Sequence, residues 1–287
     1  MSGQKMSIGI VFAGAMLCAH AQWLNHPAPG TPRAPDGKAD LSAKAPRSPD
    51  GKPDLSGVWH TELTPPGQSI LGDVSPFIVP GDDPSTFSNY FWNILADFKP
   101  EEAPMRPEAA ERFRKNVESG NNPARCLPLG VPGSDLLNYA PFKIIQAPGE
   151  IVILYEVDNQ HRQIYTDGRK FPVDPQPMWL GYSVGHWEGD TLVVDSTGFN
   201  ELGRLDGFGH PRSEALRIQE RFHRRDFGHI DLEVTVDDPK MYLKPFTVRV
   251  TEVLIPDSDV LENICNENEK DRAHLPSRPE GYQERKR

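Results

Sequence analysis

The feature that most constrains the fold is a change of pattern at Phe142. From there on, apolar and polar residues alternate with a period of two, which is typical of β-strands with one buried face. Eight segments carry the pattern: 142–146, 151–157, 161–166, 182–187, 191–196, 216–225, 229–236 and 246–255. The links between most of them are short, so the pattern predicts an antiparallel meander.

A ninth strand is predicted around Trp59, in the stretch "LSGVWHTEL". A sheet of eight or more strands that closes into a barrel loses its exposed edges and encloses a cavity. We therefore predict a mainly β fold, a lipocalin-like barrel of about eight or nine strands.

The chain before the strands is expected to be partly helical and partly disordered. Aromatic and aliphatic residues at helical spacing predict a helix over 83–98, and Pro107 is well placed to begin a second helix over 107–117. Residues 22–52 repeat "PDGKADLS" as "PDGKPDLS" and are rich in Pro, Gly and charge, which predicts a disordered leader. Residues 53–287 are then one barrel domain, with its helical segment at 83–118 packed on the barrel.

The N-terminus has the form of a secretory signal. Lys5 precedes an apolar run over 8–18, and Ala19-His20-Ala21 is a small-residue cleavage site, so we expect residues 1–21 to be removed and the protein to be secreted or periplasmic. No later segment approaches the roughly 18 apolar residues of a transmembrane helix. The 31 basic and 41 acidic residues, less Lys5, give a mature net charge of −11, which argues against a nucleic-acid partner.

Two cysteines remain after Cys18 leaves with the signal. An even pair in an oxidising compartment predicts a disulfide between Cys126 and Cys265, and the alternative is two separate buried thiols. Neither has a Cys or His neighbour at ligand spacing, so no metal site is expected. The sequence also has no HExxH, GxSxG, Walker or dinucleotide motif, and no cofactor is predicted.

Several stretches resemble a large family of secreted bacterial proteins to which no activity is assigned. They are "KPDLSGVW", "GYSVGHWEGDTLVVDSTGF", "GHPRSEALRIQERFHRRDFGHIDLEVTVDD" and "CNENEKD", and the resemblance covers most of the mature chain. The family pattern has a second histidine where this chain has Arg212, so a two-histidine role there does not carry over. The "GVW" at Gly57 to Trp59 is similar to the Gly-x-Trp start of lipocalin barrels.

The hairpin in "YSVGHWEGDTLVVDSTGF" places hydrogen-bonding side chains on one face. A two-residue Gly189–Asp190 turn pairs Trp187 with Leu192. The other face then carries Tyr182, Val184, His186, Val193 and Asp195. We predict that this mixed face lines the cavity and that the Trp187 face packs against the helices.

Three glutamates interrupt otherwise apolar strand faces. A loop at 226–228, with Gly228 in a left-handed conformation, pairs Glu220 with Val234, whereas His223 belongs to the wet opposite face. Glu156 and Glu252 share faces with valines and leucines, and a 158–160 loop would set Glu156 opposite Arg162. A buried carboxylate needs a partner or a proton. Either these glutamates form a polar patch inside the cavity, or they mark the barrel rim.

These patterns lead to two functional hypotheses. The first is binding of a small, partly apolar molecule, with Glu156, Arg162, Tyr182 and Glu252 as anchors and His210, in the "GHPRSE" loop, as part of a lid. The alternative is a hydrolase, lyase or isomerase in which His186, Glu220 and Asp195 move protons. A third, duller hypothesis is a structural or interaction protein with a filled interior.

Overall fold

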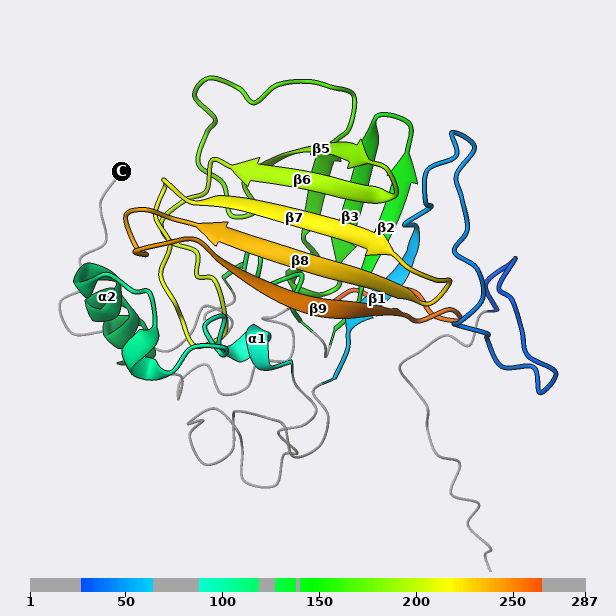
Figure 1. Cartoon of the computed structure of the whole chain (residues 1–287), viewed down its shortest axis with the longest axis horizontal. Helices are drawn as coiled ribbons and strands as arrows, with labels where there is room; N and C mark the ends of the chain where they lie inside the picture. Colours follow the sequence, from blue (N-terminus) through cyan, green and yellow to red (C-terminus); the bar gives the residue numbers. More distant parts are fainter. Residues whose placement is uncertain (1–26, 64–87, 119–126, 138–139, 265–287) are drawn as a thin grey trace, which may run out of the picture.

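A closed barrel of nine strands forms the body of the protein (Figure 1). The computed structural model describes residues 27–63, 88–118, 127–137 and 140–264. The strands are β1 (Gly57–Thr61), β2 (Phe142–Ala147), β3 (Glu150–Tyr155), β4 (His161–Tyr165), β5 (Tyr182–Glu188), β6 (Thr191–Thr197), β7 (Arg217–Arg224), β8 (His229–Asp237) and β9 (Phe246–Leu254). They follow one another around the barrel, and β1 pairs with β9 to close it. The prediction of a mainly β barrel is confirmed.

One step of the sheet departs from the predicted antiparallel meander. β4 and β5 run parallel, and their ladder has only two residue pairs, Ile164 with Ser183 and Tyr165 with Val184. Parallel neighbours need a crossover connection. Residues 166–181 provide it as a long loop on the outside of the barrel.

The turns set the register of the two long hairpins as the sequence predicted. Gly189 has a φ of 60°, and Trp187 pairs with Leu192 across the resulting turn. In the next hairpin Glu220 pairs with Val234. Gly228 is not in the predicted left-handed conformation; instead, an added Cβ there would lie 2.4 Å from the Cβ of Leu41.

The core fills the barrel from every strand. Burial alternates along β7 and β8, as expected for strands with one interior face. Trp59, Ile164, Val194, Phe222 and Val234 are each at most 1% exposed and pack in this core. The interior of the described barrel is therefore occupied by side chains along most of its length.

The N-terminal leader is folded where the structure describes it, which corrects the prediction of disorder for residues 27–52. Each copy of the repeat makes a turn closed by a β-bridge, Arg33 with Ala39 and Arg47 with Pro53. The backbone of Gly228 donates a hydrogen bond to the carbonyl of Leu41 at 2.7 Å. Composition indicated disorder because the leader has little apolar surface of its own, but the barrel end supplies the partner surface.

Helices lie beside one end of the barrel (Figure 1). α2 (Pro107–Glu118) occupies the range of the second expected helix, and its Phe113 stacks on His210. α1 (Asn89–Trp92) is a single turn within the longer helix expected over 83–98. It ends early because the Asn93 side chain accepts the N–H of Leu95 and Asp206 accepts the N–H of Ile94, so side chains replace the helical hydrogen bonds.

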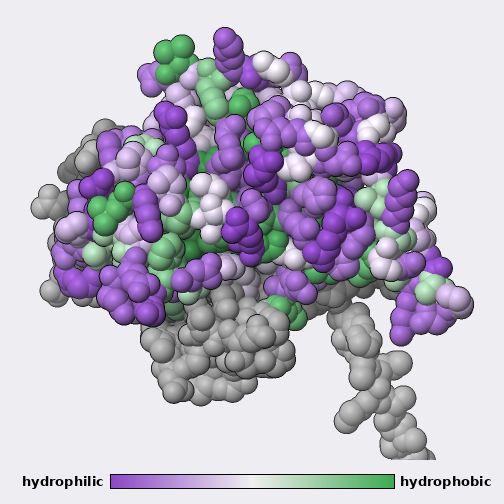
Figure 2. Space-filling model, in the orientation of Figure 1, coloured by the Kyte–Doolittle hydropathy of each residue, from purple (hydrophilic) through white to green (hydrophobic). Residues whose placement is uncertain are grey.

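The face in view in Figure 2 is mostly hydrophilic, with isolated apolar patches. Among the described residues, no helix has the length and apolar character needed to cross a membrane. The predicted signal peptide, the first part of the helix expected over 83–98, and both Cys126 and Cys265 lie outside the described residues.

Candidate functional site: a buried polar network beside a cleft

Arg162 on β4 points into the barrel and ties four strands together. Its Nη1 donates to Glu220 Oε1 on β7 at 2.9 Å, and its Nη2 also bonds Glu220, so the pair is bidentate. Its Nε donates to the Ser183 hydroxyl on β5 at 3.1 Å, and Nη2 donates to the Ser196 hydroxyl on β6 at 2.9 Å. All three nitrogens of this buried guanidinium thus have protein partners.

Two further buried carboxyl groups continue the network. Asp135 Oδ1 accepts the Tyr155 hydroxyl at 2.6 Å, and Asp135 Oδ2 lies 3.5 Å from Arg162 Nη1. Glu252 Oε1 accepts the Thr61 hydroxyl at 3.2 Å. We call these residues the buried polar network: Thr61, Asp135, Tyr155, Arg162, Ser183, Ser196, Glu220 and Glu252. All are 4% exposed or less.

The network holds one guanidinium and three carboxyl groups, so its charge depends on protonation. Burial, together with the nearby Glu220 carboxylate, raises the pKa of Asp135 to about 7. Burial and the proximity of Asp135 raise the pKa of Glu252 well above its usual range. Asp135 Oδ2 and Glu252 Oε2 also have no hydrogen-bond partner among the described residues, which makes the charged form of each carboxyl group costly to bury. A neutral Asp135 and Glu252 leave the Arg162–Glu220 ion pair balanced.

A cleft of 560 Å³ opens on the outside of this network, where β4 and β5 diverge. Trp179, Leu180 and Tyr182 contribute apolar surface to its walls, and Arg162 and Ser183 of the network form part of its lining. We call it the β4–β5 cleft. Its volume and its mixture of aromatic walls with a few polar groups are those of small-molecule sites.

The wall of the β4–β5 cleft is held from behind by Arg212. This side chain is fully buried and donates to the backbone carbonyl of Trp179 at 3.0 Å and to that of Asn200 at 2.9 Å. Burial lowers its pKa to about 9. Arg212 is therefore a structural link behind the cleft.

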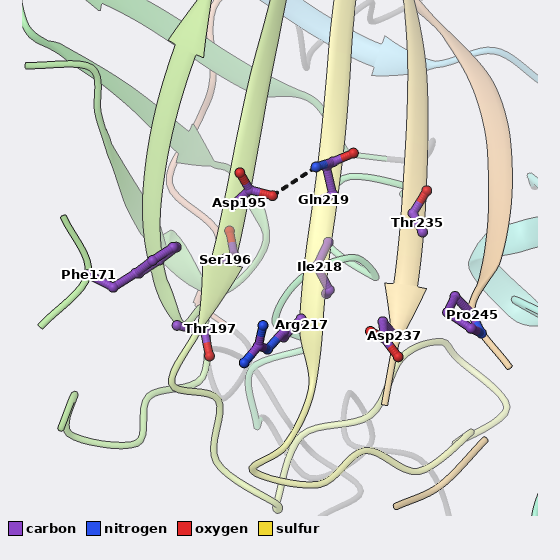
Figure 3. A pocket seen from close by; sticks show the side chains of 10 residues that line it. All are labelled: Phe171, Asp195, Ser196, Thr197, Arg217, Ile218, Gln219, Thr235, Asp237 and Pro245. Carbon is purple, nitrogen blue, oxygen red and sulfur yellow. Dashed lines mark hydrogen bonds between the residues drawn. The ribbon is translucent and has the colours of Figure 1, made fainter. Parts of the chain in front are cut away.

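A second recess, the outer groove, lies on the outward face of β6, β7 and β8 (Figure 3). It has a volume of 480 Å³, and Asp195, one of the predicted catalytic residues, lines it. Asp195 accepts a hydrogen bond from Gln219 at 3.0 Å. The outer groove and the buried polar network are on opposite faces of the same strands.

The prediction of which hairpin face lines the interior is wrong. The side chain of His186 is 58% exposed and lies 3.3 Å from Glu188, and Tyr182 packs outside the barrel against Tyr165. The interior is lined instead by the Trp187 face, which includes Ser183 and Ser196. Because Val194, not Asp195, pairs with Glu220, neither His186 nor Asp195 can meet Glu220 around one molecule.

The predicted glutamates separate into two groups. Glu220 and Glu252 are fully buried in the barrel, whereas Glu156 lies outside it and accepts the N–H of Leu261 at 2.8 Å. The expected pairing of Glu156 with Arg162 is wrong, since Arg162 pairs with Ile153. The turn is longer than three residues because Asp158 and Asn159 both adopt positive φ, a conformation that Asp and Asn tolerate.

His210 belongs to a separate cluster in the loop before β7. Its Nδ1 lies 2.5 Å from Asp206 Oδ2, and its ring stacks on Phe113 at 4.2 Å. Ser213 donates to Asp238 and not to His210. Neither the β4–β5 cleft nor the outer groove is lined by His210, so the structure does not bring it to the other predicted binding residues.

Sequence reasoning missed five members of the network: Thr61, Asp135, Tyr155, Ser183 and Ser196. The two serines carried a usable signal, because small polar residues on an otherwise apolar strand face leave room for a larger polar side chain opposite. Asp135 gave no such signal, since it lies in an irregular segment outside the period-two pattern.

Comparison with family models, with curated proteins and with solved structures finds no match to this chain.

Proposed function

We propose that this protein is a lipocalin-like barrel that binds a small, partly apolar molecule, and that the molecule lies in the β4–β5 cleft. The observation that carries the proposal is a 560 Å³ recess with aromatic walls directly above a rigid polar base. The filled barrel axis argues against a ligand at the centre, where lipocalin-type barrels would place it.

The buried polar network maintains the shape of the site, and we expect it to contribute little to direct contact with the ligand. Every nitrogen of Arg162 already has a protein partner, so the guanidinium fixes the floor of the cleft. The rim offers a hydrogen-bonding group through His161, which is exposed and lines the cleft. An amphipathic molecule would place its apolar part against Trp179 and Leu180 and its polar part at this rim.

A thermal-shift screen of the full mature chain against fatty acids, aromatic acids and sterols tests the proposal. At least one class should raise the unfolding temperature, because a ligand that binds only the folded state stabilises it. Leu180→Glu should abolish that shift, since it places a carboxylate against the apolar wall. Leu243→Glu, the same change at a leucine 63% exposed, is the matched control and should leave the shift intact.

The proposal fails if no compound stabilises the protein, or if Leu180→Glu and Leu243→Glu respond alike. We also propose that residues 1–21 direct export and that the mature protein begins at Gln22. N-terminal sequencing of protein recovered outside the cytoplasm tests this; an intact Met1 or Ser2 would contradict it.

A further inference from the structure

The outer groove presents two rows of hydrogen-bonding side chains from three adjacent strands (Figure 3). Asp195, Gln219 and Thr235 form one row, because each is the ladder partner of the next. Arg217 and Asp237 are ladder partners two residues further along and belong to the second row. Rows two residues apart lie about 7 Å from each other and neighbouring strands about 5 Å apart, which is the scale of one sugar ring.

The second row is unengaged in the part of the chain that the structure describes. Arg217 and Asp237 lie directly opposite each other, yet neither side chain makes a hydrogen bond or ion pair there. The guanidinium can therefore donate to hydroxyl or ring oxygens, and the carboxylate can accept from two hydroxyls. Hydrogen bonds that involve charged groups are the stronger kind.

One aromatic ring borders these polar rows. Phe171 comes from the 166–181 loop and lines the edge of the outer groove on the side of β5 (Figure 3). Its ring makes an edge contact with Tyr182 at 6.2 Å, which fixes it at the groove edge. A ring held in this way offers an apolar face to the C–H groups of a sugar.

The charge of the groove selects against anions. One arginine faces two carboxylates, Asp195 and Asp237, so the lining carries a net negative charge. A phosphate or an acidic polymer would meet repulsion there. A neutral ligand with many hydroxyls can use all of these groups at once.

We propose that the outer groove binds a neutral saccharide, with Arg217, Asp237 and Asp195 bonding its hydroxyls and Phe171 stacking on a ring. This site is independent of the β4–β5 cleft. The two recesses lie on either side of the contact between Phe171 and Tyr182: of these two residues, Phe171 lines only the outer groove and Tyr182 lines only the β4–β5 cleft.

Titration calorimetry of the full mature chain tests this with neutral oligosaccharides of glucose, mannose, galactose and N-acetylglucosamine, and with oligogalacturonate as the anionic comparison. At least one neutral oligosaccharide should bind and oligogalacturonate should not. Phe171→Ala should weaken binding about tenfold, the size expected for loss of one aromatic stacking contact. Asp237→Asn should weaken it as well.

Val173→Ala is the matched control for Phe171→Ala, because Val173 lies in the same loop, is fully exposed and does not line the groove. It should bind like the wild type, as should Leu180→Glu in the β4–β5 cleft. Circular dichroism of each variant shows whether the fold is retained. Binding of none of the neutral oligosaccharides, preference for the anionic one, or equal affinities of Phe171→Ala and Val173→Ala would overturn the proposal.

Discussion

Arg162 is a buried cation, and the stability of the fold depends on the Glu220 carboxylate that pairs with it. Burial alone would lower the pKa of its guanidinium, but the paired Glu220, together with Tyr155 and Asp135, more than offsets this, and the pKa is raised. A pair of this kind adds little over a well-packed apolar pair, yet breaking it leaves a charge stranded in the core.

Glu220→Gln should therefore lower the free energy of unfolding by about 3–5 kcal/mol. Urea denaturation followed by tryptophan fluorescence measures the change. Replacing both partners, as Arg162→Met with Glu220→Leu, should restore most of it because no charge is left uncompensated. Glu233→Gln on the outer face of β8, whose partner Arg249 is exposed, should cost no more than about 1 kcal/mol. Similar losses for the two glutamine variants would contradict this account.

Asp135 should make the stability of the fold depend on pH. Its folded pKa of about 7 lies above its ordinary value of 3.8, so the folded state holds a proton that the unfolded state releases. The stabilising contribution is complete below about pH 4 and is lost as the pH rises towards 7. Asp135→Asn removes this titration and can still accept the Tyr155 hydroxyl.

We expect Asp135→Asn to gain stability relative to the wild type as the pH rises from about 4 to about 7, by at most about 1.4 kcal/mol for each step of one in pH. Unfolding temperatures measured at several pH values give the difference. A constant difference between the two proteins across this range would show that Asp135 is already ionised in the folded state at about pH 4, so that its pKa is not raised.

At the scale of the element, turn chemistry predicted the register of strands but not which face is inside. The Gly189–Asp190 turn fixed the partners in the β5–β6 hairpin, and both of its faces contained enough apolar residues to be buried. The space available inside the barrel decides which of the two faces is buried. Gly185 on the interior face has Ile164 packed so closely that an added Cβ would lie 3.0 Å from it, and Ser183 and Ser196 leave space for Arg162.

The structure of the N-terminal leader, residues 27–52, could not be predicted from the sequence for a different reason. Its composition predicts no stable structure in isolation, and its turns are held by groups far along the chain, such as Asp190, which accepts from Arg47 at 2.6 Å. A partner surface formed only by the folded barrel is invisible to a local pattern. The buried glutamates at 220 and 252, in contrast, were predictable because they break strong local patterns.

Gly228→Ala should loosen the leader without unfolding the barrel. The added methyl group would meet the side chain and the backbone of Leu41, so the two segments must separate. Limited proteolysis should then cut within residues 27–52 faster than in the wild type. Gly133→Ala is the control, since its φ is not positive and an added Cβ there would lie no closer than 3.4 Å to any atom beyond its chain neighbours. Equal rates for both variants would contradict the role of this contact.

At the scale of the whole molecule, a disulfide between Cys126 and Cys265 remains a prediction, since both residues lie outside the described parts. Such a bond would close a loop of roughly 140 residues and would stabilise the fold by at most about 5 kcal/mol through the unfolded state. Thiol titration of the denatured, unreduced mature protein should find no free thiol. Two free thiols would instead indicate separate cysteines.

The directions of the nine strands explain why both recesses adjoin the same loop. Going once around a ring of nine strands, direction cannot reverse at every step, because an odd number of reversals would return the first strand pointing the wrong way. Eight pairs reverse, and in this barrel the remaining pair, β4 with β5, runs in the same direction. That pair requires a crossover, and this crossover carries Phe171 to the outer groove and Trp179 and Leu180 to the β4–β5 cleft. An odd number of strands requires a parallel pair, and because here that pair is β4 with β5 and not the closing pair β1 with β9, the barrel has the crossover loop from which walls of both proposed binding sites are built.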